Sequence, residues 1–386
     1  MPEELPANQN SVADQAWSVR MADSVIRRHS PATARWHYED GLVLKAIEQV
    51  GRATGEARYR RFVKDTIDLF IDPAGGIRTY NLEEYNLDQI NAGKLLFPLY
   101  QVTGDERYKK AAALLRKQLE AQPRTRAGGF WHKQIYPDQM WLDGIYMAAP
   151  FYAEFARMFD EPSAFDDAAH QIILIAEHAR DPNTGLLYHA WDESKQQRWA
   201  NPETGCSPHF WGRAVGWYAM ALVDVLDHFP EDHPRREALV AIFGRLTAAL
   251  ERFQDAATGL WYQVLDQGQR AGNYLEASAS CMFVYAIAKG VRKQHLPTGY
   301  LAMARNGYQG IVRDLITVDT QGLVTLERIC AVAGLGGNPY RDGSFEYYVG
   351  EKVASNDYKG VGPFILASLE IEGAATDGPS RGQVSR

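Results

Sequence analysis

Apolar residues recur at spacings of three and four along most of the chain, which is the periodicity of amphipathic helices. In one set of segments the intervening residues are charged, as around Arg107, Lys110 and Arg116, so one side of each helix is expected to face water. We predict six helices of this kind, near residues 12–28, 56–71, 105–121, 163–179, 232–254 and 297–315.

A second set of segments is more apolar on all sides and has a small residue early, such as Gly41, Gly93 and Gly144. Helices of this kind pack against neighbours on more than one side. The two sets alternate strictly along the sequence, and the simplest architecture for that order is an all-α (α/α)6 barrel of six helix hairpins, with the apolar set as its inner ring. The inner helices are predicted near residues 37–54, 86–103, 139–158, 209–228, 275–292 and 360–371.

The interval between inner segments varies from about 50 to about 80 residues, so the chain is not a short-period solenoid. Glycine-containing aromatic stretches, such as 128–132 and 258–262, are typical of a turn followed by a short β ribbon. They precede inner segments, so we expect them to lie together at the mouth where the inner helices begin. No linker divides the chain, which predicts one domain over residues 1–372 and a disordered tail over residues 373–386.

The chain has 386 residues and a formal net charge of −7. That charge argues against nucleic acid as a partner, and it requires a local cluster of cations for any anionic substrate. Cys206, Cys281 and Cys330 are too few and too widely spaced for a disulfide framework or a zinc site. The first 16 residues lack the apolar stretch of a secretory signal, and no run of about 18 apolar residues would span a membrane. We therefore expect a cytoplasmic protein with no membrane contact and no metal.

Two aspartates near the starts of inner segments are the candidates for catalysis. Asp143 follows Met140 and Trp141, beyond the position of the usual helix cap. Asp88 opens a neighbouring inner segment, where either Asp88 or Asn86 also qualifies as a cap. All six inner helices begin at one face, so both carboxylates are expected to face one cavity. Paired carboxylates are typical of sugar hydrolysis.

Cations are predicted at the same mouth. Arg213 follows Trp211 at the start of another inner segment, where a buried arginine either grips a carboxylate or forms a structural ion pair. Most of the 9 Trp and 20 Tyr residues are expected in the core and a few at a sugar site, and Trp141 and Trp211 lie near the predicted mouth. Further positive or ionisable groups on this face are His37, His132, Lys133 and His189.

Six short motifs carry these candidates: Trp36-His-Tyr, Leu87-Asp-Gln-Ile-Asn-Ala-Gly, Gly129-Phe-Trp-His-Lys, Gln139-Met-Trp-Leu-Asp-Gly, Tyr188-His-Ala-Trp-Asp and Gly205-Cys-Ser-Pro-His-Phe-Trp-Gly-Arg. Taken together, they resemble the unsaturated rhamnogalacturonyl hydrolases of glycoside hydrolase family 105. The resemblance extends over residues 12–372, which is nearly the whole chain.

The resemblance implies an (α/α)6 barrel, no metal or organic cofactor, and a substrate with a 4,5-unsaturated galacturonosyl unit linked to rhamnose. It also implies that Asp143 is the catalytic acid/base and that Asp88 is the second acidic residue. The partner is then an unsaturated pectin-derived oligosaccharide, and we expect a monomer or a weak homo-oligomer. Substrate contacts implied by the resemblance fall on His37, Tyr38, Lys133, His189, Trp211 and Arg213.

The reaction implied by the resemblance differs from ordinary sugar hydrolysis. The C4=C5 bond makes the sugar a vinyl ether, so Asp143 protonates C4, water adds at C5, and the resulting hemiketal opens and expels the rest of the chain. Four alternatives stay open at this point. They are an unsaturated glucuronyl hydrolase acting on glycosaminoglycan fragments, an inverting glycosidase with Asp88 and Asp143 as acid and base, a sugar isomerase or epimerase with His37 and His189 as proton carriers, and a carbohydrate-binding protein without catalysis.

Overall fold

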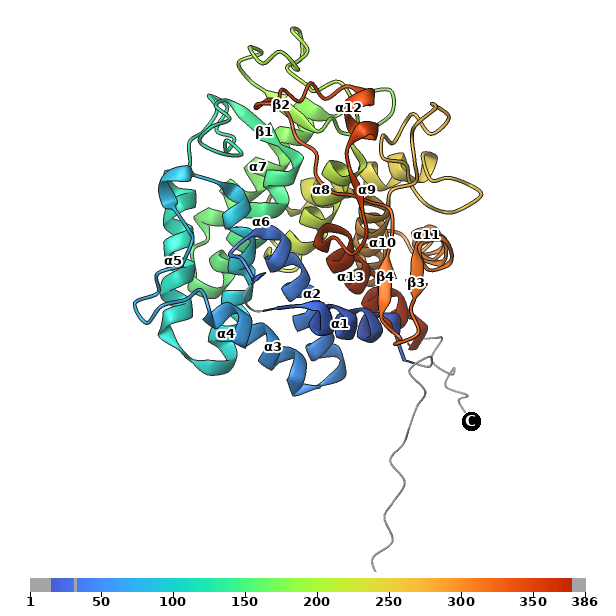
Figure 1. Cartoon of the computed structure of the whole chain (residues 1–386). Coiled ribbons are helices and arrows are strands. Elements are labelled where there is room, and N and C mark those ends of the chain that lie inside the picture. The colour runs from blue at the N-terminus through green and yellow to red at the C-terminus, as the bar shows by residue number, and fades with distance from the viewer. Residues whose placement is uncertain (1–14, 31–32, 377–386) are drawn as a thin grey trace, which may run out of the picture.

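The computed structural model describes residues 15–30 and 33–376. Its inner helices form a closed ring in which each contacts the next and the last returns to the first, which confirms the predicted (α/α)6 barrel (Figure 1). The inner elements are α2 (Tyr38–Thr54), α4 (Leu96–Thr103) with the 3-10 turns before it, α6 (Leu142–Phe159), α8 (Gly212–Val225), α10 (Ala277–Arg292) and α13 (Tyr358–Thr376).

An outer helix packs against each inner one, because its apolar residues form a single stripe. In α3 (Ala57–Asp68), for example, Tyr59, Val63 and Ile67 are buried at intervals of four, and Arg60 between them is exposed. In the inner α8, by contrast, every residue except Asp224 is buried. The other outer helices are α1 (Trp17–Arg28), α5 (Glu106–Ala121), α7 (Ser163–Ala179), α9 (Arg236–Arg252) and α11 (Tyr300–Asp314).

Small residues let the inner elements approach closely. A Cβ atom on Gly41 of α2 would lie 2.7 Å from the Cα atom of Ala92, which is closer than side chains tolerate. Gly41 therefore fixes the contact between α2 and the segment that carries Asp88, and a larger residue would push the two apart.

Two inner segments differ from their predicted form. Residues 86–103 are not one helix, because they begin with the 3-10 turns η4 (Leu87–Gln89) and η5 (Asn91–Leu95). The Asn86 side chain caps η4 by accepting a hydrogen bond from the Asp88 N–H at 3.0 Å. The fourth inner helix, predicted from residue 209, begins at Gly212 as α8, and the Ser207 hydroxyl before it accepts a hydrogen bond from the Ala190 N–H.

Short β elements gather where the inner helices begin. Strands β1 (Gln139–Trp141) and β2 (Ala190–Asp192) are antiparallel, and they lie near α12 (Phe345–Gly350) at the top of Figure 1. Several predicted ribbons are reduced to single bridges, such as the one between Arg124 and Phe130. The segment between α11 and α13, for which no elements were predicted, contains β3 (Ile316–Val318), β4 (Val324–Leu326), β5 (Ile329–Cys330), α12 and β6 (Val353–Ala354).

The end of the chain differs in part from the expectation. Helix α13 continues to Thr376, beyond its predicted end at residue 371, and residues 377–386 of the predicted tail lie outside the described residues.

All three cysteines are buried and free. No helix of the described ranges is both long and apolar enough to cross a membrane. Within these ranges, no cluster of three or more His, Cys, Asp or Glu side chains is arranged to hold a metal ion.

Candidate active site

Asp88 lies at the barrel mouth as part of a compact charged cluster. Its side chain is 9% exposed, and its Oδ2 atom is 2.6 Å from Lys133 Nζ. Its Oδ1 atom is 3.4 Å from His132 Nε2. Burial by itself would raise the pKa of the Asp88 carboxyl, but Lys133 and His132 outweigh it and hold that pKa below its usual range. Asp88 is therefore an ionised carboxylate at neutral pH.

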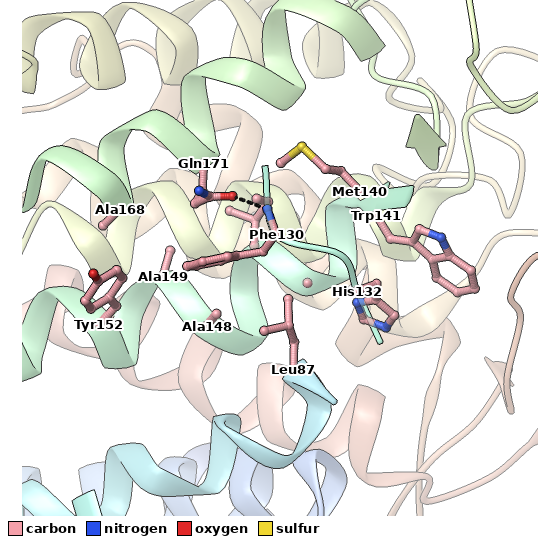
Figure 2. A pocket seen from close by; sticks show the side chains of 12 residues that line it. Leu87, Phe130, His132, Met140, Trp141, Ala148, Ala149, Tyr152, Ala168 and Gln171 are labelled. Carbon is pink, nitrogen blue, oxygen red and sulfur yellow. Dashed lines mark hydrogen bonds between the residues drawn. The ribbon is translucent and has the colours of Figure 1, made fainter. Parts of the chain in front are cut away.

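His132 is held by aromatic packing. Its ring stacks on Trp141 with the centroids 4.9 Å apart and the planes 7° from parallel. Figure 2 shows His132, Leu87 and Phe130 around a small apolar pocket of about 10 Å³, with the Gln171 side chain bound to the Phe130 backbone N–H. A pocket of that size holds no sugar, so it belongs to the packing behind the site. Burial lowers the pKa of His132 to about 4 although Asp88 opposes the shift, so this ring is neutral at pH 7.

Asp143 lies in the first turn of α6, directly after strand β1, and has a different partner. Its Oδ2 atom is 3.1 Å from Nε2 of His189, which is fully buried. The two atoms are not aligned as a hydrogen bond, and catalytic contacts are often loose before substrate binds. In the described part of the chain, no lysine or arginine nitrogen lies within 4 Å of the Asp143 carboxylate.

His189 is oriented from its other side by Tyr348 of α12, whose hydroxyl is 2.8 Å from Nδ1. When the tyrosine donates to Nδ1, the ring proton must be on Nε2, where it faces Asp143. Tyr348 is itself fully buried and stacks on Trp211. Asp143, His189 and Tyr348 thus form a chain of polar groups that enters the site from three different segments.

Tyr38, the first residue of α2, interacts electrostatically with both aspartates. Burial raises the pKa of the Tyr38 phenol well above its usual value, and the carboxylates of Asp88, Glu39 and Asp143 add to that rise while Arg213 opposes it. The phenol therefore lies within electrostatic range of both aspartates. Side chains from the 86–103 segment, α6 and α8 thus lie within electrostatic range of Tyr38 on α2, and their role in one site stays a prediction.

Arg213, predicted to contact the substrate, is almost completely buried. It is 1% exposed, and its Nη1 donates to the Cys330 carbonyl and, at 3.4 Å, to the Ser278 hydroxyl. Its guanidinium lies 4.8 Å from the centre of the Trp211 ring. Glu276, fully buried at the start of α10, attracts it electrostatically. Among the described residues no carboxylate lies within 4 Å of the guanidinium and its Nε atom has no acceptor, so the structural ion pair is not formed and the substrate contact of Arg213 stays a prediction.

His37 stands at the edge of the site. Its side chain is 32% exposed, and its Nδ1 atom is 3.6 Å from Glu39. Glu39 also binds Lys359 of α13, which is 3% exposed. His37 is thus tied to a peripheral ion network, whereas His189 contacts a candidate catalytic carboxylate directly.

The profile of Glycosyl Hydrolase Family 88 matches residues 15–374. The chain belongs to this family. A family 105 glycoside hydrolase of C. acetobutylicum ATCC 824 is 50% identical, with 93% of this chain and 100% of that one covered and a TM-score of 0.91, which confirms the resemblance to family 105. The unsaturated rhamnogalacturonyl hydrolase YesR of Bacillus subtilis (strain 168) is 27% identical over 282 residues, or 72% of this chain and 77% of that one. The unsaturated glucuronyl hydrolase of Bacillus sp. GL1 shares the fold at 13% identity, with 93% and 96% covered and a TM-score of 0.67.

This family 88 hydrolase also contains site residues that the sequence analysis missed. Glu276 precedes an inner helix as Asp88 does, so the rule that found the aspartates would have found it. Gln263, which accepts a hydrogen bond from the Trp211 indole and donates to the Tyr348 carbonyl, carries no such signal. Tyr348 lies in the segment without helical periodicity, so the pattern gave no reason to single it out.

Proposed function

We propose that this glycoside hydrolase removes the terminal 4,5-unsaturated galacturonosyl residue from rhamnogalacturonan oligosaccharides by hydrating the C4=C5 bond. The observation that carries the proposal is the unlike surroundings of its two carboxylates. Asp88 is neutralised by Lys133 at 2.6 Å, whereas Asp143 lies 3.1 Å from the ring of His189. Two carboxyl groups held in different environments are suited to different roles in acid–base catalysis.

In the proposed reaction Asp143 delivers its proton to C4, which leaves oxocarbenium character at C5. Water adds at C5 and returns a proton to Asp143, so one residue serves as acid and then as base. The hemiketal then opens and releases the leaving alcohol. Asp88 stays ionised and orients the sugar and the water, and well-positioned acid–base catalysis of this kind contributes roughly 10²–10⁴-fold to a rate.

The other predicted substrate contacts differ in how well the structure supports them. Lys133, 24% exposed, is near enough to solvent to face the substrate carboxylate while it neutralises Asp88. Trp141 is 5% exposed and stacks on Tyr136 with the ring centres 4.8 Å apart, so its contact with the sugar stays a prediction. The name of the relative YesR supports rhamnose-linked substrates. The cytoplasmic location and the monomeric or weakly oligomeric state expected from the sequence stay predictions.

The test is to incubate the protein with unsaturated rhamnogalacturonan and glycosaminoglycan disaccharides and to follow the loss of the ultraviolet absorbance of the conjugated enoate. We expect faster loss with the rhamnose-linked substrate. A preference for the glycosaminoglycan disaccharide would overturn the substrate assignment and favour the glucuronyl hydrolase alternative. Cleavage of saturated galacturonosyl-rhamnose at an equal rate would overturn the hydration mechanism and favour an inverting glycosidase.

A further inference from the structure

A large pocket lies at the end of the barrel opposite the candidate active site. It has a volume of about 590 Å³ and is lined by residues from the C-terminal halves of the inner helices and from η5. Pockets that hold small molecules are typically about 300–1,000 Å³. The pocket is therefore large enough for a ligand of monosaccharide size.

The pocket is rich in cations although the chain as a whole is acidic. Seven lysine or arginine side chains line it against four carboxylates, whereas the chain carries a net charge of −7. Some of these cations are explained by local structure, because helix C-termini carry partial negative charge and favour lysine and arginine. Lys289 is paired with Asp224 at 2.6 Å and with Asp227 at 2.7 Å.

Lys94 is not explained in this way. It lies in the last turn of η5, but the chain continues directly into α4 at Leu96, so no helix ends there. It is 3% exposed, and in the described part of the chain its Nζ atom has no hydrogen-bond acceptor. Its nearest stabilising contact is the ring of Tyr146, 3.7 Å from Nζ to the ring centre. A buried ammonium without an acceptor is costly unless a partner enters the pocket that it lines.

At pH 7 burial leaves Lys94 only about half protonated. Burial lowers its pKa to about 7, although Asp224 opposes the shift, and an anion bound beside Nζ would favour the charged form. Arg157 also lines the pocket, is exposed, and has no carboxylate within 4 Å among the described residues. Lys94 and Arg157 thus have no carboxylate partner within 4 Å among the described residues.

We propose that this pocket binds a small anion whose carboxylate or phosphate oxygens accept hydrogen bonds from Lys94 and Arg157. The inference is independent of the proposed catalytic function, because every residue that supports it lies outside the candidate active site. A sugar acid and inorganic phosphate share this chemistry, and separate titrations distinguish them.

The test is calorimetric titration of the intact protein with inorganic phosphate and, separately, with D-galacturonate, at an ionic strength held constant with sodium chloride. We expect a dissociation constant below about 1 mM for at least one of the two anions. Lys94→Met should weaken binding about tenfold or more, because a charge-assisted hydrogen bond is lost, and Arg157→Gln should weaken it severalfold. The matched control is Lys117→Met on the exposed face of α5, which should bind as the wild type does.

Three outcomes would overturn the proposal: neither anion binds the wild-type protein, both pocket variants bind as tightly as the wild type, or binding is lost in an Asp88→Asn/Lys133→Met variant and kept in Lys94→Met. The last result would locate the anion in the candidate active site. If Lys94→Met fails to fold, as judged by circular dichroism, the exposed Arg157 decides the test through Arg157→Gln.

Discussion

Replacing Lys133 by methionine removes the cation that neutralises Asp88 and leaves most of the lysine's apolar stem in place. The wild-type pair is 2.6 Å apart, and the side chains are 24% and 9% exposed. Removing one partner of a buried ion pair costs about 3–5 kcal/mol, because the other charge is left without compensation. Lys133→Met is therefore expected to lower the free energy of unfolding at pH 7 by about 3–4 kcal/mol.

Protonation of Asp88 sets an independent upper limit on that cost. The stranded carboxyl can take up a proton, and from an ordinary pKa of 3.8 this costs roughly 1.4 kcal/mol for each of about three pH units, or about 4 kcal/mol at pH 7. The cost must therefore shrink as the pH falls. In the folded wild type the pKa of the Asp88 carboxyl is lower than its unfolded value of 3.8. The ionised carboxylate therefore contributes stability above pH 3.8, and this contribution is lost as the pH falls through the pKa of the folded state.

The assay is urea unfolding followed by tryptophan fluorescence at pH 7 and at pH 4.5 for the wild type, Lys133→Met, Asp88→Asn/Lys133→Met, and the exposed-lysine control Lys117→Met. The double variant should recover most of the lost stability, because it removes the stranded charge. The control should stay within about 0.5 kcal/mol of the wild type. A Lys133→Met protein as stable as the wild type, or a double variant no more stable than Lys133→Met, would refute the electrostatic reasoning about this pair.

Three further predictions concern the other groups of the site. Asp143→Asn should lower kcat by several orders of magnitude with KM nearly unchanged, because asparagine cannot transfer the proton; near-normal turnover in a folded variant would remove Asp143 from the proposed role. Tyr348→Phe should lower kcat about tenfold with little effect on KM, through loss of the hydrogen bond that orients His189; equal kinetics would show that this bond does not matter to turnover. His132 is neutral when folded, with its pKa near 4 rather than 6.5, so its contribution to stability is present above pH 6.5 and is lost as the pH falls toward 4. Between pH 6.5 and pH 4 the free energy of unfolding of a His132→Phe variant, measured with urea, should therefore fall by roughly 3 kcal/mol less than that of the wild type. An equal fall in both proteins would contradict a buried, neutral His132 ring.

Helix periodicity predicted the barrel well because the burial pattern there is local. The helix expected at residues 163–179 is α7, Ser163–Ala179, and the one expected at 105–121 is α5, Glu106–Ala121. The same rule was wrong for residues 86–103, where the Asn86 cap starts a 3-10 turn and the chain then passes through η5 before it becomes α-helical. An apolar composition fits both forms, so periodicity alone does not distinguish them.

The segment between α11 and α13 escaped prediction for a different reason. Its strands have two or three residues each, and β5 pairs with β6 through the register Ile329 to Ala354. Such contacts between distant residues leave no periodic signal. Tyr348 becomes a site residue through this folding, because its hydroxyl reaches His189 across 159 positions of the sequence.

The roles of the two aspartates follow from pairings of the same long-range kind. The sequence brings both carboxylates to one mouth but does not say which cation belongs to which. In the folded chain Lys133 lies against Asp88, and His189 lies against Asp143. Had Lys133 paired with Asp143 instead, that residue would be fixed as an anion, and Asp88 would be the better proton donor. The assignment of acid and anion therefore depends on the paths that the loops after α5 and α7 take to the mouth, and it requires the structure.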